Sequence, residues 1–225
     1  SVICTDKTRT LTSGDMTVVR VWAGGEDVHP RDAAKGHADG DGVGRLRHAL
    51  EVAALASRVQ AGGDDADRGP IGDPVDVAML GAASEAGIER APLAAARPSL
   101  GLVPFSTERK LMATFRQVDG GIVAYAKGAP RQILQISSRS PDGTALDEAG
   151  RAALVAVNER FARAGLRVLA LSSGPVGAAD AGALHDLTFA GFVGLMDPPA
   201  PGVKETIALL KAAGLRTVML TGDAP

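Results

Sequence analysis

The sequence lacks a cysteine pair, has few aromatic residues and contains no long apolar run. Its one cysteine, Cys4, cannot form an internal disulfide, and its apolar surroundings predict a small core residue in a reducing compartment. No uninterrupted apolar stretch approaches the roughly 18 residues that a membrane helix needs, so we expect no direct membrane insertion. The net charge of -2 provides no basic field for nucleic acid.

What is present is ordinary for a globular protein. The 225 residues are 45% hydrophobic and 22% charged, which suffices for one large domain or two small ones. The chain starts inside an apolar strand and stops directly after another. We therefore predict two domains and expect the sequence to be a piece of a longer protein.

Both ends of the chain predict α/β structure. The apolar run Val2-Ile3-Cys4 leads to Asp6, and residues 217–220 form a second apolar run after a helical pattern over 203–213. A helix that feeds a strand is half of a βαβ unit, so residues 1–5 and 217–220 are expected as buried parallel strands. The carboxyl edge of such a sheet is where α/β proteins place their chemistry, and Asp6 would emerge there.

The middle of the chain predicts an antiparallel α+β domain between those ends. Residues 24–44 and 61–72 are Gly-rich and polar, typical of connections. Residues 111–126 predict a hairpin around Asp119-Gly120-Gly121. Apolar periodicity predicts the remaining elements, which are helices at 45–60, 73–87, after Pro130 and at 147–163, and strands at 166–172 and 187–195.

The predicted organisation is therefore an interrupted sheet domain with an insertion. Residues 1–20 would be the first segment of that domain, 21–190 the inserted domain, and 191–225 a second, incomplete segment of the sheet domain.

The heptapeptide Asp-Lys-Thr-Arg-Thr-Leu-Thr at 6–12 resembles the phosphorylation signature of the P-type ATPases, which are ion pumps. The family has glycine where this chain has Arg9. Further blocks resemble the family in the same order, and together they cover nearly the whole chain: GDPVDVAML at 72–80, PFSTERKLMA at 104–113, YAKGAP at 125–130, GLRVLALS at 165–172, GLMDPPAPGVKE at 194–205 and LTGD at 220–223.

The resemblance implies a phosphorylation site on an incomplete haloacid-dehalogenase-like Rossmannoid sheet. Asp6 would be the nucleophile that accepts a phosphoryl group, with Lys7 beside it. Asp6 and Thr8 would hold Mg²⁺, which screens the carboxylate from the γ-phosphate. Thr221 and Gly222 would hold phosphate oxygens, and Asp223 would lie near the nucleotide. Asp197 resembles the family's hinge between domains.

The resemblance also implies an ATP site in the inserted domain. Phe105 would stack on adenine, and Asp76, where the family has glutamate, would accept from the adenine amino group. Lys127, followed by Gly128, would approach the adenosine or its phosphates, and Arg167 suits a β-phosphate. Lys110 is a secondary contact.

The implied parent is an integral membrane cation pump of the calcium, sodium-potassium and proton branch, with this chain as a soluble part on the cytoplasmic side. Its membrane and actuator domains would be partners that this chain lacks, and the transported ion is not readable. Arg9 adds bulk where glycine lets the backbone approach phosphate, so a catalytically decayed ATP-binding module is one alternative. A soluble phosphohydrolase of the dehalogenase-like superfamily is another.

Overall fold

The structure is a computed structural model that describes residues 2–7, 9–25, 27–33, 41–60 and 71–220. Contacts divide the chain into two compact units. Unit 1 comprises Ser1–Thr17 and Asp197–Pro225, and unit 2 comprises Val18–Met196. The boundaries predicted from the sequence lie a few residues away, at 20/21 and 190/191. The two units are described separately below.

Unit 2 is built on a seven-stranded sheet with the order β2-β10-β9-β7-β6-β5, in which β8 pairs with β10. The pairs β5/β6, β6/β7, β7/β9 and β9/β10 are antiparallel. The strands are β2 (Thr17–Trp22), β5 (Ser99–Val103), β6 (Leu111–Val118), β7 (Gly121–Gly128), β8 (Ser137–Arg139), β9 (Arg167–Val176) and β10 (Leu187–Met196).

One face of this sheet carries a large apolar core cluster of unit 2. Alternate side chains of the hairpin β6/β7, among them Phe115 and Ala126, pack against α5 (Pro130–Gln135) and α6 (Glu148–Arg163). Leu134, Leu154 and Phe161 are the helix contributions, and all three are buried. The apolar stripe of α6 therefore faces the sheet and its charged residues face solvent.

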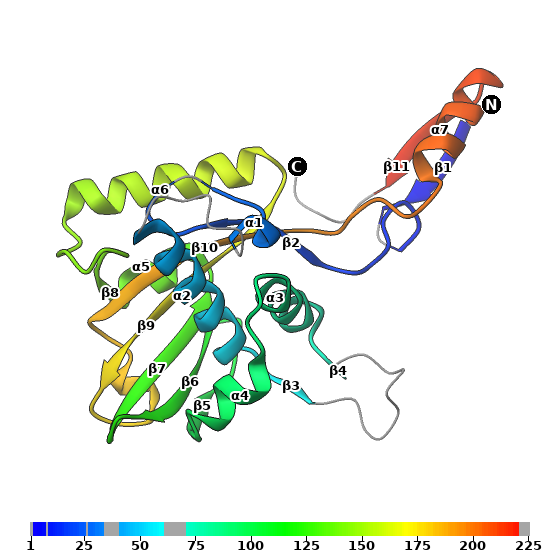
Figure 1. Ribbon diagram of the computed structural model, residues 1–225. Helices are drawn as coiled ribbons and strands as arrows, with labels where there is room; N and C mark the ends of the chain where they lie inside the picture. Colours follow the sequence, from blue (N-terminus) through cyan, green and yellow to red (C-terminus); the bar gives the residue numbers. More distant parts are fainter. Residues whose placement is uncertain (1, 8, 26, 34–40, 61–70, 221–225) are drawn as a thin grey trace. The chain divides into compact units, whose positions relative to one another are not determined.

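The opposite face is covered by α2 (Asp41–Leu55) and α3 (Pro74–Glu85), which pack against each other. It differs from the first face because polar side chains point into it: Thr114 and Arg116 of β6 reach the end of α2, and Lys127 of β7 reaches α3. In Figure 1, α2 runs across this face of the sheet. This polar face positions the site described below.

The predicted hairpin and long helices are confirmed. The β6/β7 turn places Asp119 and Gly120 at φ values of 46° and 79°, as a two-residue hairpin turn requires. Helix α3 starts where Asp73 caps the amide of Val75, and α6 starts where Asp147 caps that of Gly150. Helix α2 starts and ends a few residues earlier than predicted.

The shorter elements of unit 2 were not all predicted. They are α1 (Pro30–Ala33), β3 (Val59–Gln60), β4 (Ile71–Gly72), α4 (Arg90–Ala95) and a 3-10 turn at Ala181–Ala183. Strands β2 and β5 were also missed, although the segment TVVRVW of β2 is rich in the β-branched and aromatic residues typical of strands. No helix among the described residues combines the length and the apolar character required to cross a bilayer.

Unit 1 contains a parallel pair formed by β1 (Val2–Asp6) and β11 (Arg216–Leu220), in a register that sets Asp6 opposite Leu220. Helix α7 (Val203–Ala212) precedes β11 and contacts it. The predicted pairing of the first and last strands is confirmed. The described residues thus form a mixed α and β structure with the parallel pair β1/β11, the largely antiparallel seven-stranded sheet and the short antiparallel pair β3/β4.

The predicted burial of these two strands is wrong. Cys4 is exposed rather than part of a core, and Val2, Met219 and Leu220 are each more than half exposed. The physical reason is that the described part of unit 1 holds only two strands and one helix, too few layers to cover both faces.

Candidate nucleotide-binding site

A cavity of about 200 Å³ opens on the polar face of the unit 2 sheet. It lies between the start of α3, the start of β6, the end of β7 and the start of β9. Its walls consist of Asp73, Val75, Asp76, Phe105, Met112, Lys127, Gly128, Arg167 and Leu169. The structure thus brings together five residues that the sequence predicted for nucleotide binding: Asp76, Phe105, Lys127, Gly128 and Arg167.

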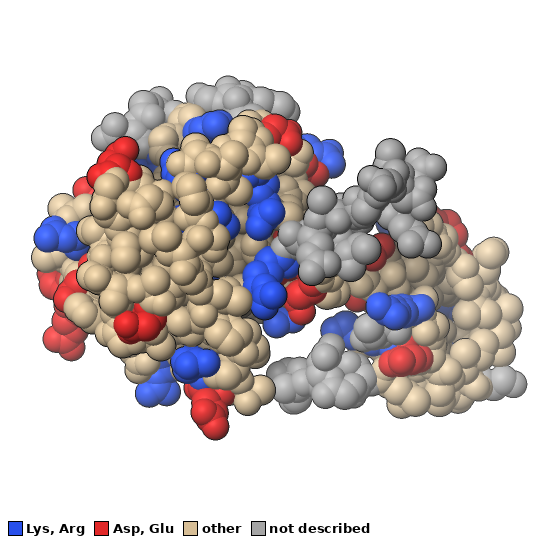
Figure 2. Space-filling model, turned by 90° about the horizontal axis from the view of Figure 1, so that it is seen from below, with Lys and Arg blue, Asp and Glu red and all other residues tan. Residues whose placement is uncertain are grey.

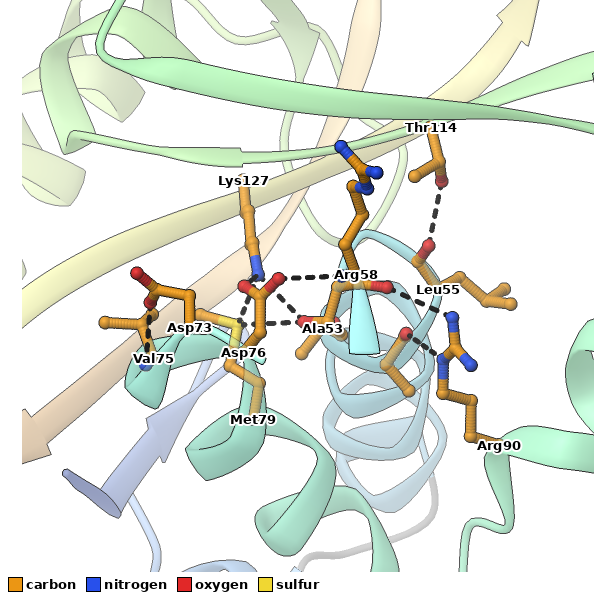
Figure 3. Close-up of polar contacts among 12 residues, drawn as sticks. Ala53, Leu55, Arg58, Asp73, Val75, Asp76, Met79, Arg90, Thr114 and Lys127 are labelled. Carbon is orange, nitrogen blue, oxygen red and sulfur yellow. Dashed lines mark hydrogen bonds and ion pairs between the residues drawn. The ribbon is translucent and has the colours of Figure 1, made fainter. Parts of the chain in front are cut away.

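A buried ion pair forms the floor of this cavity. The Lys127 ammonium contacts the Asp76 carboxylate, and both side chains are almost fully buried. Lys127 Nζ also donates to Ser57 Oγ at 2.8 Å and lies 3.8 Å from Met79 Sδ. Asp76 Oδ2 accepts from the backbone amide of Arg58 at 2.7 Å. Figure 3 shows these contacts gathered around the pair formed by Lys127 of β7 and Asp76 of α3, with the segment after α2 beside it.

Two opposed effects act on the charge of Lys127. Burial lowers the pKa of its ammonium from the ordinary value, and the attraction of Asp76 offsets only part of that effect. The sequence predicted a lysine at a strand end that could meet phosphates freely. The Asp76 carboxylate instead balances the Lys127 charge within the protein. The cavity is therefore less positively charged than the presence of a lysine alone would indicate.

Phe105 supplies an aromatic wall. Its side chain is 59% exposed although it is large and apolar. Val75, Met112 and Leu169 add apolar surface to the same cavity. An exposed aromatic ring beside an apolar cleft suits a flat heteroaromatic ring, which would stack on Phe105 and be desolvated by the aliphatic side chains.

Gly128 is required by a close approach of two backbone segments. A Cβ atom at this position would lie 2.5 Å from the Lys110 carbonyl oxygen. The Ala129 amide also donates to that oxygen, at 2.8 Å. A side chain at residue 128 would therefore push β7 away from the segment that carries Phe105.

The two remaining basic candidates differ in position. Arg167 begins β9, is exposed and lines the cavity, so its guanidinium is the accessible cation there. Lys110 is exposed, has a φ of 51° and does not line the cavity. The contact of Lys110 with this region is made by its backbone: its carbonyl oxygen lies close to Gly128 and accepts from the Ala129 amide.

Sequence reasoning missed Ser57, Arg58 and Met79, which hold the ion pair. They lie between 18 and 70 positions from their partners along the chain. No motif links residues so distant. Asp73, which was predicted only to start a helix, also lines the cavity.

In unit 1, Asp6 lies at the end of β1, as predicted, and is exposed. Its Oδ1 accepts from the Lys7 amide at 2.7 Å, and that amide also approaches the Leu220 carbonyl oxygen at 3.2 Å. Thr8, Thr221, Gly222 and Asp223, four residues of the predicted phosphorylation site, lie outside the described residues.

Asp197 holds the loop that follows β1. Its Oδ2 accepts from Thr12 Oγ1 at 2.7 Å and its Oδ1 from the Gly14 amide at 2.9 Å. Within this loop Arg9 has a φ of 58°, a left-handed conformation that glycine adopts without strain and arginine does not. The substitution of the family's glycine therefore falls at a position whose backbone favours glycine.

The donor set for Mg²⁺ is only partly within the described chain. There, no three His, Cys, Asp or Glu side chains come together as a metal site. Asp6 offers a carboxylate, the hard oxygen ligand that Mg²⁺ prefers. Asp6 is thus compatible with a metal ligand, and the rest of the expected set is not described.

The chain resembles known proteins along its length. A family model described as P-type ATPase, cytoplasmic domain N, matches residues 45–202. A calcium-transporting ATPase of Bacillus subtilis is 31% identical over 99% of this chain and 27% of its own length. The cation-transporting ATPase pma1 of Synechocystis is 33% identical, with the same coverage.

The human calcium-transporting ATPase type 2C member 1 is 33% identical over the whole of this chain, and the match covers 25% of its own length. The chain thus spans about a quarter of these relatives. The family model covers more than half of the chain, and its residues include Asp76, Phe105, Lys127 and Arg167. The chain belongs to the P-type ATPase family, and residues 45–202 correspond to its cytoplasmic domain N.

Proposed function

We propose that unit 2 binds ATP in the cavity around Phe105. The observation that carries this proposal is the convergence of an exposed aromatic ring, an apolar cleft and an accessible guanidinium on one cavity. The N domain match supports it. Adenine stacks on Phe105, and Arg167 donates to a phosphate.

The buried pair gives the cavity its shape in this proposal. Asp76 keeps lone pairs for an amino group while its charge is matched by Lys127. Lys127, fixed by Ser57 and Met79, presents an ordered surface rather than a mobile charge. Such preorganisation reduces the entropy lost on binding.

We propose further that Asp6 accepts the γ-phosphoryl group in a longer protein. Asp6 and Thr8 would hold Mg²⁺ with residues outside this chain, and the ion would screen the negative partners from each other. Thr221 and Gly222 would hold phosphate oxygens, with Lys7 and Asp223 nearby. Strands β1 and β11 would belong to a haloacid-dehalogenase-like sheet that spans residues 1–20 and 191–225, with domain 21–190 inserted.

The parent protein would couple this chemistry to cation transport. Two of the relatives are calcium-transporting ATPases and one is a cation-transporting ATPase, and each is about four times as long as the aligned part. The parent would hold membrane and actuator domains as partners, with the present chain on the cytoplasmic side.

Calorimetric titration with ATP tests the binding proposal. Replacing Phe105 by alanine should weaken ATP binding about tenfold or more, since stacking of a base on an aromatic ring is worth roughly 1–3 kcal/mol. Leu100→Ala is the matched control, because Leu100 is also an exposed apolar residue of unit 2 but does not line the cavity. Equal affinities of wild type and Phe105→Ala would remove Phe105 from the site.

Arg9 supports a second candidate, an ATP-binding module that no longer transfers phosphate. Its left-handed backbone carries a bulky cation three residues after the proposed nucleophile. A displacement of about 1 Å can reduce a rate roughly a hundredfold. The third alternative from the sequence, a soluble phosphohydrolase, has no specific observation in its favour.

Phosphoenzyme formation in the full-length protein separates the first two candidates. With labelled ATP and Mg²⁺, an active pump should form an acid-stable, hydroxylamine-sensitive adduct that Asp6→Asn abolishes. If Arg9→Gly is needed before the adduct appears, the protein is a decayed enzyme. If neither form is labelled while ATP still binds, the binding module is the better description.

A further inference from the structure

A second cavity of about 380 Å³ lies on the same face of the sheet, beyond the end of α2. Residues from β5, β6, α4 and the segment after α2 form its walls. They are Ser57, Arg58, Arg90, Ala94, Ser99, Gly101, Leu102, Thr114 and Arg116. Three of these side chains are guanidinium groups, and none is acidic.

Arg116 is the most unusual of them because it is 5% exposed and has no carboxylate partner among the described residues. Its NH1 donates to the Arg97 carbonyl oxygen at 3.0 Å and its NH2 to the Leu55 carbonyl oxygen at 3.3 Å. Its buried Nε has no hydrogen-bond partner within the described chain. Buried polar groups are normally satisfied, so this shielded N–H leaves the Arg116 guanidinium incompletely hydrogen-bonded among the described residues.

The other charges around the cavity increase this imbalance. Burial lowers the pKa of Arg116, and the neighbouring cations Arg90 and Arg97 lower it further. Two described carboxylates of the neighbouring helices α2 and α3 are engaged elsewhere: Glu51 pairs with Arg47 and Arg97, and Asp76 pairs with Lys127. Among the described residues, the cavity walls therefore carry more positive than negative charge.

Capping of α2 explains only part of this arrangement. Arg90 donates to the Ala54 and Ser57 carbonyl oxygens, and Thr114 shares the Leu55 carbonyl oxygen with Arg116. Cations are favoured at a helix C-terminus. Capping gives no role to Arg116 Nε or to the Arg58 guanidinium, which makes no hydrogen bond or ion pair with a described residue.

The views agree with a solvent-accessible basic site. Figure 3 shows the Arg58 side chain extending away from Asp76, whereas its backbone amide binds that carboxylate. Helix α4 and strand β5 lie at the bottom of Figure 1. Figure 2, which shows the molecule from below, has several Lys and Arg side chains exposed among uncharged residues.

We propose that this second cavity binds a phosphate-class oxyanion, either free phosphate or the phosphoryl group of a small organic phosphate. The exposed Arg58 guanidinium donates to its oxygens, and Arg90 and Arg116 contribute positive charge. Forked guanidinium groups suit such anions. The site is separate from the Phe105 cavity, so it does not depend on ATP binding there.

Amide chemical shifts of the labelled 225-residue chain test the proposal during titration with inorganic phosphate, against chloride at equal ionic strength. Amides of residues 57, 58, 90, 114 and 116 should shift saturably, with a dissociation constant of about 1 mM or less. Arg58→Gln should weaken binding about fivefold, as expected for one exposed charge-assisted contact. Arg131→Gln is the matched control, because Arg131 is an exposed arginine on α5 outside this cavity.

Glycerol phosphate serves as the second ligand. Tighter binding than inorganic phosphate identifies an organic phosphate as the occupant, and equal or weaker binding identifies the free ion. The proposal is overturned if about 20 mM phosphate gives no saturable shifts at these amides, if chloride gives the same shifts, or if Arg58→Gln binds as well as wild type.

Discussion

Lys127 and Arg116 are two buried cations on one face of one sheet, and their charges are stabilised in different ways. Lys127 contacts a carboxylate, a hydroxyl and a thioether. Arg116 contacts two backbone carbonyl oxygens and keeps one N–H without a described partner. The first charge is matched within the protein, whereas the second is matched only by peptide dipoles.

The difference predicts which ligand each cavity suits. A matched charge leaves the Phe105 cavity largely apolar, as an aromatic base requires, with Arg167 at its edge for phosphate. The arginine cavity retains uncompensated charge and suits a small anion. The following variants test this comparison by removing one charge at a time.

The largest effect is expected from Asp76→Ala. Removing the carboxylate leaves the Lys127 ammonium buried without a counter-charge, and breaking such a pair typically lowers the free energy of unfolding by about 3–5 kcal/mol. Urea unfolding at neutral pH measures the change. A loss below about 1 kcal/mol would mean that Ser57 and Met79 alone suffice to hold Lys127.

The double variant Asp76→Leu, Lys127→Met is the control for that experiment. It removes both charges and fills the space with apolar groups, so most of the lost stability should return. A double variant as unstable as Asp76→Ala would point to lost packing rather than to an unpaired charge.

Local patterns predicted much of the fold. Asp119-Gly120 predicted the hairpin turn, and Asp73 before Pro74 predicted the start of α3, because these signals act within a few residues. Burial at the chain ends was not predictable in the same way. An apolar strand such as β1 is buried only where other elements cover it, and Cys4 shows that the described chain does not cover it.

The candidate site was predicted as a set of positions but not as a set of contacts. The family resemblance indicated Asp76, Phe105, Lys127 and Arg167, and the structure gathers them at one cavity. It did not indicate that Asp76 and Lys127 neutralise each other. That pairing depends on how α3 packs on β7, a tertiary contact without a local signal.

Arg116→Met should destabilise the protein less than Asp76→Ala, by about 2 kcal/mol. The variant loses two charge-assisted bonds to carbonyl groups, but it also removes a buried cation that lacks a carboxylate, and these effects partly cancel. Urea unfolding compares the two variants. Phosphate should raise the unfolding midpoint of wild type and leave that of Arg116→Met unchanged; equal shifts in both would place the anion elsewhere.

Arg167→Gln should weaken ATP binding about tenfold, or roughly 1.4 kcal/mol, without changing stability, because Arg167 is exposed and donates to the ligand rather than to the fold. Arg58→Gln removes a guanidinium from the neighbouring cavity and should leave ATP affinity within about twofold. Calorimetry on both variants measures this contrast. If Arg58→Gln weakens ATP binding as much as Arg167→Gln, the two cavities form a single site.

The smallest effect concerns pH. Burial lowers the pKa of Lys127 below its ordinary value, so between the folded and unfolded pKa values the unfolded chain binds more protons than the folded chain. The free energy of unfolding therefore rises with pH across that window, by at most about 1.4 kcal/mol per pH unit.

This contribution of Lys127 is measured as the difference in unfolding free energy between wild type and the double variant Asp76→Leu, Lys127→Met, because the effects of other titrating groups cancel in that difference. Urea unfolding from neutral pH to about pH 10.5 measures it. A difference that falls with rising pH would mean that the attraction of Asp76 outweighs burial, and Lys127 would then be the more strongly held of the two buried cations.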